Sequence, residues 1–424
     1  MKKVFSVAII GCGSRGCDAY GKLMYAEADE YVITALCDVN SEKLKKYAKA
    51  FNVAEENLFN DEGEFFKEKR ADVLVIATQD KDHVRECLKA FELGYHVLLE
   101  KPISPDLDEL NALLQAHKKY QRKVIVCHVL RYAPAYTKLY ELLRSGVIGE
   151  LVRMEATENV AYWHQAHSFV RGNWRNEEET SPMIMAKCCH DLDLIQWYVG
   201  SACQSVYSTG DLRYFKSEKQ PQGASDECIS CKYIKDCPYS AETLYVKRFK
   251  NNFNCQGWPY NVVDSSEPIT EESLRKAYSS NRYGRCVFKC DNDVVDNQSV
   301  EMVFENGVRA TLIMTAFTAF EGRRYVFHGT LGEIEFNEHE RYIRVMLYGK
   351  ETETISVDEL LKNSKKSGFG HGGGDFGIVQ SFYKMLTGEQ KESDGTSLEA
   401  SVESHLIALK AEISRKSGNA VRVH

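Results

Sequence analysis

Val4-Phe-Ser-Val-Ala-Ile-Ile-Gly11-Cys-Gly13-Ser-Arg-Gly16 is the stretch that decides the fold of the first third of this chain. An apolar strand runs directly into three glycines, and a helix-compatible run follows to about Glu30. Glycines let the backbone turn tightly and approach a pyrophosphate, whose charge is met by amide N–H groups at the helix N-terminus. The segment predicts a nucleotide site formed by Gly11, Gly13, Ser14, Arg15 and Gly16. A purely structural loop is the alternative.

A second apolar strand, Tyr31 to Cys37, ends at Asp38, about twenty residues after the last glycine. A carboxylate at this place accepts hydrogen bonds from both ribose hydroxyls of a dinucleotide and repels a 2′-phosphate. NAD(H) is therefore the expected cofactor and NADP(H) is less favoured, although the positive charge of Arg15 softens that preference.

Length and composition bound the class of protein. The chain has 424 residues, of which 43% are hydrophobic, which is enough for a large core and two domains. Its formal net charge of -7 comes without any basic block, so nucleic acid and anionic membrane surfaces are not expected partners. The 14 cysteines are spread through a long chain that shows neither a signal region nor a run of about eighteen apolar residues. Reduced thiols and a cytoplasmic location are expected.

The rhythm of the sequence changes near residue 128. Before it, short apolar strands at 73–78, 96–100 and 124–128 alternate with amphipathic helices, as in a parallel sheet covered on both faces. After it, alternating strands and hairpins indicate an antiparallel sheet, and Asn306-Gly307 suits the type I′ turn of one hairpin. The predicted fold is α/β. A Rossmann domain with a doubly wound parallel sheet occupies residues 1–128, and an α/β domain with a large, mostly antiparallel open sheet occupies residues 129–424.

The second predicted domain is expected both to bind substrate and to form an oligomer. Residues 211–290 are interpreted as a cysteine-rich insertion, and helices are expected near 375–386 and 398–414, with Asp375 as an N-cap. An open sheet with one uncovered face would expose apolar surface. We therefore expect a homo-oligomer, either a dimer or a tetramer.

Two ionisable groups are candidates for proton transfer. Glu100-Lys101-Pro102 follows the fourth strand, at the carboxyl edge where ligands bind in open α/β sheets, so Glu100 and Lys101 join the predicted cofactor site. Lys101 could also hydrogen-bond a substrate hydroxyl. The second group is His190 in Lys187-Cys-Cys-His190-Asp191, on a helix predicted over 183–199 where Lys187 and Asp191 share its face. The polar side of a structural helix is the alternative.

Aromatic and polar side chains gather in Trp163-His-Gln-Ala-His167-Ser-Phe-Val-Arg171-Gly-Asn-Trp174-Arg175. A sugar offers C–H faces to aromatic rings and hydroxyl groups to polar side chains. The residues predicted to contact substrate are Arg131, His167, Arg171, Trp174 and Asp191. The alternative for the segment is a surface loop with a tryptophan tucked into the core.

Two further motifs have less certain chemistry. Cys228-Ile-Ser-Cys231, followed by Cys237, has the spacing of a structural zinc site whose fourth ligand is unassigned. Free thiols and a redox-labile disulfide are the alternatives. In Gly370-His371-Gly-Gly-Gly374-Asp375, the glycines predict a mobile or tightly folded loop, and His371 could reach the site.

Taken in order, these motifs resemble the Gfo/Idh/MocA oxidoreductases over nearly the whole chain. The resemblance rests on the glycine turn, Asp38, Ala77-Thr78 with His83, Glu100-Lys101-Pro102, the segment from Leu130-Arg131-Tyr132 to Gly146-Val-Ile-Gly149, and His190-Asp191-Leu-Asp193. It implies a Rossmann domain, a second α/β domain and a site between them. It also implies that Thr78 and His83 lie near the cofactor, and that Lys101 and His190 hold the catalytic positions. Many members carry an aspartate four residues before the histidine, where this chain has Ala186.

The resulting hypothesis is an NAD-dependent oxidoreductase that acts on a CH–OH group of a sugar, amino sugar or cyclitol. His190, assisted by Lys101, would take the hydroxyl proton while Lys187 stabilises the oxyanion. One alternative is a glycoside-cleaving or epimerising enzyme with tightly bound NAD and a transient keto sugar. The other is an NAD-sensing protein without turnover.

Overall fold

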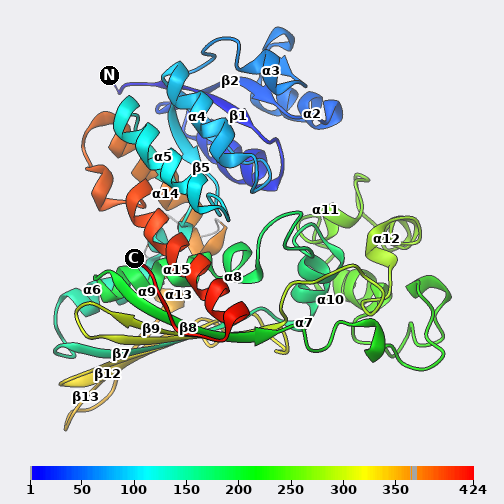
Figure 1. The fold of residues 1–424 in the computed structure, drawn as a ribbon. Coiled ribbons are helices and arrows are strands. Elements are labelled where there is room, and N and C mark those ends of the chain that lie inside the picture. Colours follow the sequence, from blue (N-terminus) through cyan, green and yellow to red (C-terminus); the bar gives the residue numbers. More distant parts are fainter. Residues whose placement is uncertain (1, 363, 365–369) are drawn as a thin grey trace.

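The computed structural model describes residues 2–362, 364 and 370–424, arranged around two β-sheets (Figure 1). The first sheet has six strands, all parallel, in the order β3-β2-β1-β4-β5-β6. The strands are β1 (Phe5–Ile10), β2 (Tyr31–Cys37), β3 (Leu58–Phe59), β4 (Val73–Ile76), β5 (His96–Leu99) and β6 (Val124–Val126). The strand order reverses between β1 and β4, which is the point at which doubly wound sheets bind ligands.

Both faces of the first sheet are covered because its strands are apolar on both sides. Val7 and Ile9 of β1 pack into one buried cluster and Ala8 and Ile10 into another. The helical elements of this part are η1 (Ser14–Gly21, a π-helical segment), α1 (Lys22–Ala26), α2 (Ser41–Phe51), α3 (Glu62–Phe65), α4 (His83–Leu93) and α5 (Leu107–Tyr120). The helix α14 (Gly374–Thr387), from the far end of the sequence, joins the first cluster. The first sheet therefore borrows part of its cover from the C-terminal region.

The second sheet has nine strands in the order β14-β13-β12-β11-β7-β10-β9-β8-β15. Its strands are β7 (Leu151–Asn159), β8 (Cys203–Asp211), β9 (Asn297–Phe304), β10 (Arg309–Thr315), β11 (Gly322–Gly329), β12 (Gly332–Asn337), β13 (Tyr342–Leu347), β14 (Glu353–Ser356) and β15 (Val421–Arg422). The pair β7 and β10 is parallel and the other described pairs of this sheet are antiparallel. The predicted fold class is thus confirmed.

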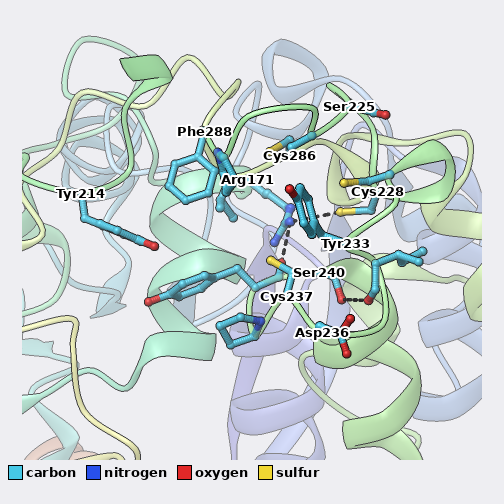
Figure 2. A pocket seen from close by; sticks show the side chains of 17 residues that line it. Arg171, Tyr214, Ser225, Cys228, Tyr233, Asp236, Cys237, Ser240, Cys286 and Phe288 are labelled. Atoms are coloured by element: carbon cyan, nitrogen blue, oxygen red, sulfur yellow. Dashed lines mark hydrogen bonds between the residues drawn. The ribbon is translucent and has the colours of Figure 1, made fainter. Parts of the chain in front are cut away.

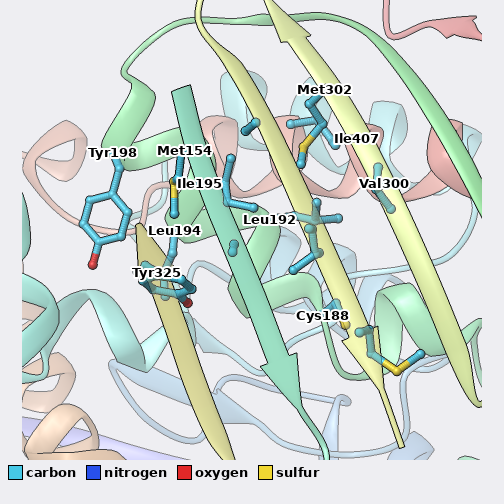
Figure 3. Packing of buried hydrophobic residues seen from close by; sticks show 14 of the residues in the cluster. Met154, Cys188, Leu192, Leu194, Ile195, Tyr198, Val300, Met302, Tyr325 and Ile407 are labelled. Atoms are coloured by element: carbon cyan, nitrogen blue, oxygen red, sulfur yellow. The ribbon is translucent and has the colours of Figure 1, made fainter. Parts of the chain in front are cut away.

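Helices cover one face of the second sheet (Figure 1). The helical elements that surround it are η3 (Val129–Tyr132), α6 (Pro134–Arg144), α7 (Tyr162–His164), η4 (Gln165–Arg171), α8 (Met183–Ala186), α9 (Cys189–Val199), α13 (Val357–Lys362) and α15 (Leu398–Ser417). Figure 3 shows how Met154, Val300 and Met302 of the strands meet Leu192 and Ile195 of α9 and Ile407 of α15 in one buried cluster. Burial of this apolar face holds α9, and with it His190, against the sheet.

The opposite face of the second sheet is open within this chain. Its alternate residues include Val152, Tyr207 and Ile313, whose exposed fractions are 54%, 43% and 44%. Residues between β8 and β9 form a separate lobe with its own buried cluster and the helices α10 (Arg248–Asn251), α11 (Tyr260–Val263) and α12 (Glu271–Tyr278). Figure 1 shows this lobe beside the sheet rather than on it. Among the described residues, every helix is too short or too polar to span a lipid bilayer.

Three local predictions were wrong. The helix expected over 183–199 is broken, because Lys187 and Cys188 separate α8 from α9. The turn at Asn306-Gly307 is not type I′, since positive φ occurs at Gly307 but not at Asn306. Asp375 does not cap its helix: α14 begins at Gly374, and the Asp375 carboxylate binds Arg15 instead.

Candidate functional site

The glycine turn lies at the end of β1, where the backbone passes very close to β4. A Cβ atom on Gly11, which has a φ of +87°, would lie 2.3 Å from the carbonyl oxygen of Ala77, and one on Gly16 would lie 2.1 Å from the carbonyl oxygen of Gly11. Only glycine fits at these two positions. A Cβ atom on Gly13 would meet nothing within 4 Å, so this face of the turn is open. The exposed Ser14 begins η1 beside it. The residues present therefore fit a dinucleotide pyrophosphate.

Asp38 lies just beyond β2, within reach of the same turn. Its carboxylate oxygens accept hydrogen bonds from the backbone N–H of Cys12 at 2.8 Å and of Asn40 at 2.8 Å. These two bonds fix the acid beside the glycine turn, at the position where a ribose would lie in this kind of fold.

Arg15 joins the glycine turn to two distant acids. Its side chain donates to Glu100 at 2.8 Å and to Asp375 at 2.8 Å, and it also contacts the hydroxyl of Tyr20. Burial would raise the pKa of Glu100 and of Asp375, but the positive charge of Arg15 outweighs burial and lowers the pKa of both. Arg15 is therefore committed to internal ion pairs, which reduces its capacity to attract a 2′-phosphate.

Thr78 and His83 bind protein groups around β4 and β5. The hydroxyl of Thr78 donates to Glu86 at 2.6 Å, and burial raises the pKa of that carboxyl to about 8. The ring of His83 is 1% exposed and its Nδ1 lies 2.7 Å from the carbonyl oxygen of Pro102. His83 therefore supports the turn that carries Lys101, and its place near the cofactor stays a prediction.

Lys101 and His190 come from separate parts of the chain and lie close enough for the positive charge of Lys101 to act on the His190 ring. Lys101 Nζ donates to the carbonyl oxygen of Ala186 at 3.3 Å, at the end of α8 and four residues before His190. Burial, and next the positive charge of Lys101, lower the pKa of His190 well below its ordinary value. His190 is 8% exposed, and within the described part of the chain its Nδ1 has no hydrogen-bond partner. A neutral imidazole with an unused nitrogen beside an ammonium group can accept a proton from a bound hydroxyl.

Lys187 and Asp191 lie in a buried ion-pair network beneath His190. Lys187 Nζ lies 3.2 Å from Glu158 Oε1, and Arg323 Nη2 lies 2.9 Å from Glu158 Oε2. Asp191 is fully buried, and it accepts hydrogen bonds from Arg323 at 2.8 Å and from Tyr325 at 3.2 Å. Both side chains are engaged with other protein groups, and the oxyanion role of Lys187 and the substrate contact of Asp191 stay predictions.

Arg131 and Trp174 also have protein partners. Arg131 forms a double hydrogen bond to the Asp193 carboxylate, at 2.7 and 2.6 Å, and its guanidinium lies over Trp197. Trp174 packs against the core cluster of the second sheet. These contacts give both residues a structural role next to α9, and their contact with substrate stays a prediction.

His167 and Arg171, the two residues most strongly expected to bind substrate, instead hold the lobe between β8 and β9. Arg171 is fully buried and donates to the carbonyl oxygens of Arg285 at 2.7 Å and Tyr239 at 2.8 Å. His167 is 2% exposed and stacks on Tyr283, and burial lowers its pKa to about 3. The insertion folds back and supplies protein partners for both residues, and their contact with substrate stays a prediction.

Cys228, Cys231 and Cys237 line a cavity of about 290 Å³ in the same lobe (Figure 2). In residues 2–362, 364 and 370–424, no three histidine, cysteine or acidic side chains are grouped so that they could hold a metal ion. The sulfur of Cys228 instead accepts from Arg171 at 3.6 Å and from the N–H of Ala241 at 3.4 Å. The expectation of structural zinc therefore finds no support, and the cysteines of the described chain are free thiols.

Sequence reasoning missed four residues of the site region. They are Tyr20, Glu158, Arg323 and Asp375, of which Asp375 was predicted only as a helix cap and not as the ion-pair partner of Arg15. Glu158 has a detectable signal, since an acid at the end of a strand that faces a helix needs a cation. The pairing of Arg15 with Asp375 joins residues 360 positions apart, and no local pattern reveals it.

Comparison with known proteins gives a consistent result. A family model described as an oxidoreductase family with an NAD-binding Rossmann fold matches residues 5–128, and the corresponding C-terminal alpha/beta domain matches residues 140–367. The protein YteT of Bacillus subtilis (strain 168) is 26% identical over 386 residues, which cover 87% of this chain and 86% of YteT. An inositol 2-dehydrogenase/D-chiro-inositol 3-dehydrogenase of Lactiplantibacillus plantarum is 24% identical over 51% of this chain and 59% of its own length.

Solved structures show the same fold. The WlbA dehydrogenase from Chromobacterium violaceum, in complex with NADH and UDP-GlcNAcA, superposes with a TM-score of 0.67 at 15% identity, covering 100% of this chain and 96% of that one. The two family models together match most of the chain. The chain therefore belongs to the Gfo/Idh/MocA family of NAD(P)-dependent oxidoreductases.

Proposed function

We propose that this enzyme uses NAD to oxidise a CH–OH group of a sugar, amino sugar or cyclitol, or to reduce the corresponding ketone. The observation that carries the proposal is that Lys101, beside the turn held by Arg15 and Glu100, hydrogen-bonds the Ala186 carbonyl in the segment that leads to His190. Nicotinamide supplies the hydride chemistry when it is bound, and the protein supplies orientation and proton handling.

The proposed roles follow from the charges of the two groups. Lys101 carries the positive charge that stabilises the substrate oxygen as it loses its proton. His190 is neutral because burial and Lys101 lower its pKa, and it accepts that proton. Lys187 is left out of the chemistry because Glu158 holds it.

NAD is proposed over NADP because of Asp38 and Arg15. The Asp38 carboxylate is fixed by two backbone N–H groups, and its charge would repel a 2′-phosphate. Arg15, the nearby cation, is neutralised by Glu100 and Asp375. The sugar or cyclitol class is supported by the L. plantarum relative, whose name gives inositol as its substrate.

The variant Lys101→Ala tests the proposal. We expect it to lose turnover while NAD affinity, measured by fluorescence titration, stays close to that of the wild type. Lys118→Ala, which changes an exposed lysine on α5, is the matched control. A Lys101→Ala enzyme with normal rates would refute the assignment.

A redox-neutral reaction, in which NAD stays bound and a keto sugar forms transiently, is a second candidate. It is favoured by Ala186, which stands where many relatives have an acid and offers only its carbonyl oxygen to Lys101. The two reactions differ in whether reduced cofactor accumulates. Parallel measurement of absorbance at the NADH band and of product by mass spectrometry distinguishes them.

We also propose that the open face of the second sheet is buried in a homo-oligomer. Val152, Tyr207 and Ile313 lie on β7, β8 and β10, and each exposes an apolar side chain on that face. Light scattering coupled to gel filtration should give a dimer or tetramer. A strict monomer would contradict this part of the proposal.

A further inference from the structure

Two other imidazoles lie beside His190, namely the buried His128, with ring centroids 5.8 Å apart, and the more exposed His371. The rings of His371 and His190 have centroids 6.4 Å apart. His371 lies in the C-terminal part of the sequence, just before α14, whereas His190 lies in α9. Two rings whose centroids lie this far apart leave room for one bridging hydroxyl or water between them.

His371 is held in the manner of a proton-transfer residue. Its Nδ1 lies 3.1 and 3.2 Å from the two carboxylate oxygens of Asp375. A carboxylate on one ring nitrogen fixes the tautomer and the orientation of the ring, and leaves Nε2 as the nitrogen that can exchange a proton.

The carboxylate that orients His371 is itself anchored. Asp375 is 3% exposed and forms an ion pair with Arg15, which also pairs with Glu100. Glu100 in turn accepts from the backbone N–H of Lys101 at 2.9 Å. One chain of contacts therefore runs from the glycine turn through the Lys101 turn to His371.

The two histidines differ in their access to water. The side chain of His371 is 42% exposed, whereas the His190 residue is 8% exposed. A proton taken up by His190 therefore needs a second group to transfer it to the solvent. His371 is the neighbouring imidazole with a solvent-exposed side chain.

We infer that His371 is a proton-relay residue, which exchanges protons between His190 and the solvent and is oriented for this by Asp375. The inference rests on the proposed function, in which His190 accepts the substrate proton. In the oxidation direction the O–H bond of the substrate breaks and the proton passes to His190, then to His371 and then to water. The C–H electron pair leaves as hydride to NAD, so atoms and electrons balance.

Ring-proton exchange with water, measured by NMR on NAD-loaded, 15N-histidine-labelled enzyme without substrate, tests the inference. We expect the His190 ring proton to exchange roughly tenfold or more slowly in His371→Gln than in the wild type, with added imidazole restoring the rate. His371→Ala is compared in the same way, because an opened site would accelerate exchange in this variant but not in the isosteric glutamine variant.

His328→Ala is the matched control, since His328 is a comparably exposed histidine, 38% against 42%, on the second sheet. It should leave the exchange at His190 unchanged. An unchanged exchange rate in His371→Gln, or a slowed rate that imidazole does not restore, would overturn the inference. Because no turnover is measured, failure of the dehydrogenase proposal in the Lys101→Ala experiment is a separate outcome.

Discussion

Replacement of Lys187 by methionine distinguishes a structural lysine from a catalytic one. Glu158 is 1% exposed, and its two oxygens lie 3.2 Å from Lys187 and 2.9 Å from Arg323. Burial would lower the pKa of Lys187, but the charge of Glu158 outweighs burial and raises it. The lysine is thus charged in a buried pair, and Lys187→Met would leave Glu158 with Arg323 alone.

The expected loss follows from this geometry. Removal of one partner from a buried ion pair costs about 3–5 kcal/mol, and the remaining contact to Arg323 reduces the expected loss to about 2–3 kcal/mol. Glu158→Gln should cost a similar amount, because it strands the Lys187 ammonium. The double variant removes both charges, so its loss should be smaller than the sum of the single losses by roughly 1 kcal/mol or more.

Urea denaturation of the four proteins gives the unfolding free energies, and NAD-dependent turnover is measured on the same samples. We expect the loss of unfolding free energy in the double variant to be smaller than the sum of the two single losses. We expect kcat in the double variant to stay within about an order of magnitude of the wild type. Unchanged stability in Lys187→Met, together with turnover lost equally in the single and double variants, would refute the structural assignment and return Lys187 to the oxyanion role.

Three further predictions concern the cofactor turn, the buried histidines and the cysteines. Gly16→Ala should destabilise the NAD-free protein, because its Cβ would lie 2.1 Å from a backbone oxygen. Gly13→Ala should leave the stability of the NAD-free protein intact and weaken NAD binding alone. Thermal shifts with and without NAD check both variants, and equal stability of the two NAD-free variants would contradict this prediction. Burial lowers the pKa of His128, His167, His190 and His405, so the unfolded state binds more protons than the folded state below the ordinary histidine pKa. The free energy of unfolding should therefore fall between pH 7 and pH 5.5 by about 1.3 kcal/mol for each of these histidines. Glu86 partly offsets this loss, because its pKa is raised to about 8 in the folded state. Urea titrations that show greater stability at pH 5.5 would disprove the prediction. Protein purified without chelator should contain far less than one zinc ion per chain by elemental analysis. A full equivalent of zinc in the wild type that is lost in Cys228→Ser would contradict this and support a structural zinc site.

The sequence reveals the first sheet because its signals are local. Apolar runs and the glycine turn each act within a few residues. Helix starts are equally local, since Asn40 and Asp106 cap α2 and α5 with their own side chains. Lys101 could be placed at the site because ligands bind at the carboxyl edge of such sheets, whereas its pairing with His190 followed from the family resemblance. The general position of the site follows from topology alone.

The partners of buried charges could not be predicted in the same way. Lys187 and Glu158 are separated by α7, η4, a loop and α8, and nothing in the period of α9 indicates the helix break at Lys187. Arg171 looked available for substrate because its segment is rich in aromatic residues, yet its partners Tyr239 and Arg285 lie in the insertion far along the chain. Side-chain partners that are set by tertiary packing cannot be read from the periodicity of the sequence.

Transfer of deuterium from substrate carbon to the cofactor tests the central proposal most directly. Enzyme loaded with NAD is incubated with sugars and cyclitols that carry deuterium on carbon, and the cofactor is analysed by mass spectrometry. We predict that a substrate of this class leaves deuterium on the nicotinamide in the wild type. Lys101→Ala should bind NAD but leave its cofactor unlabelled. A product formed by the wild type with no deuterium ever reaching the nicotinamide would contradict hydride transfer at the site of Lys101 and His190.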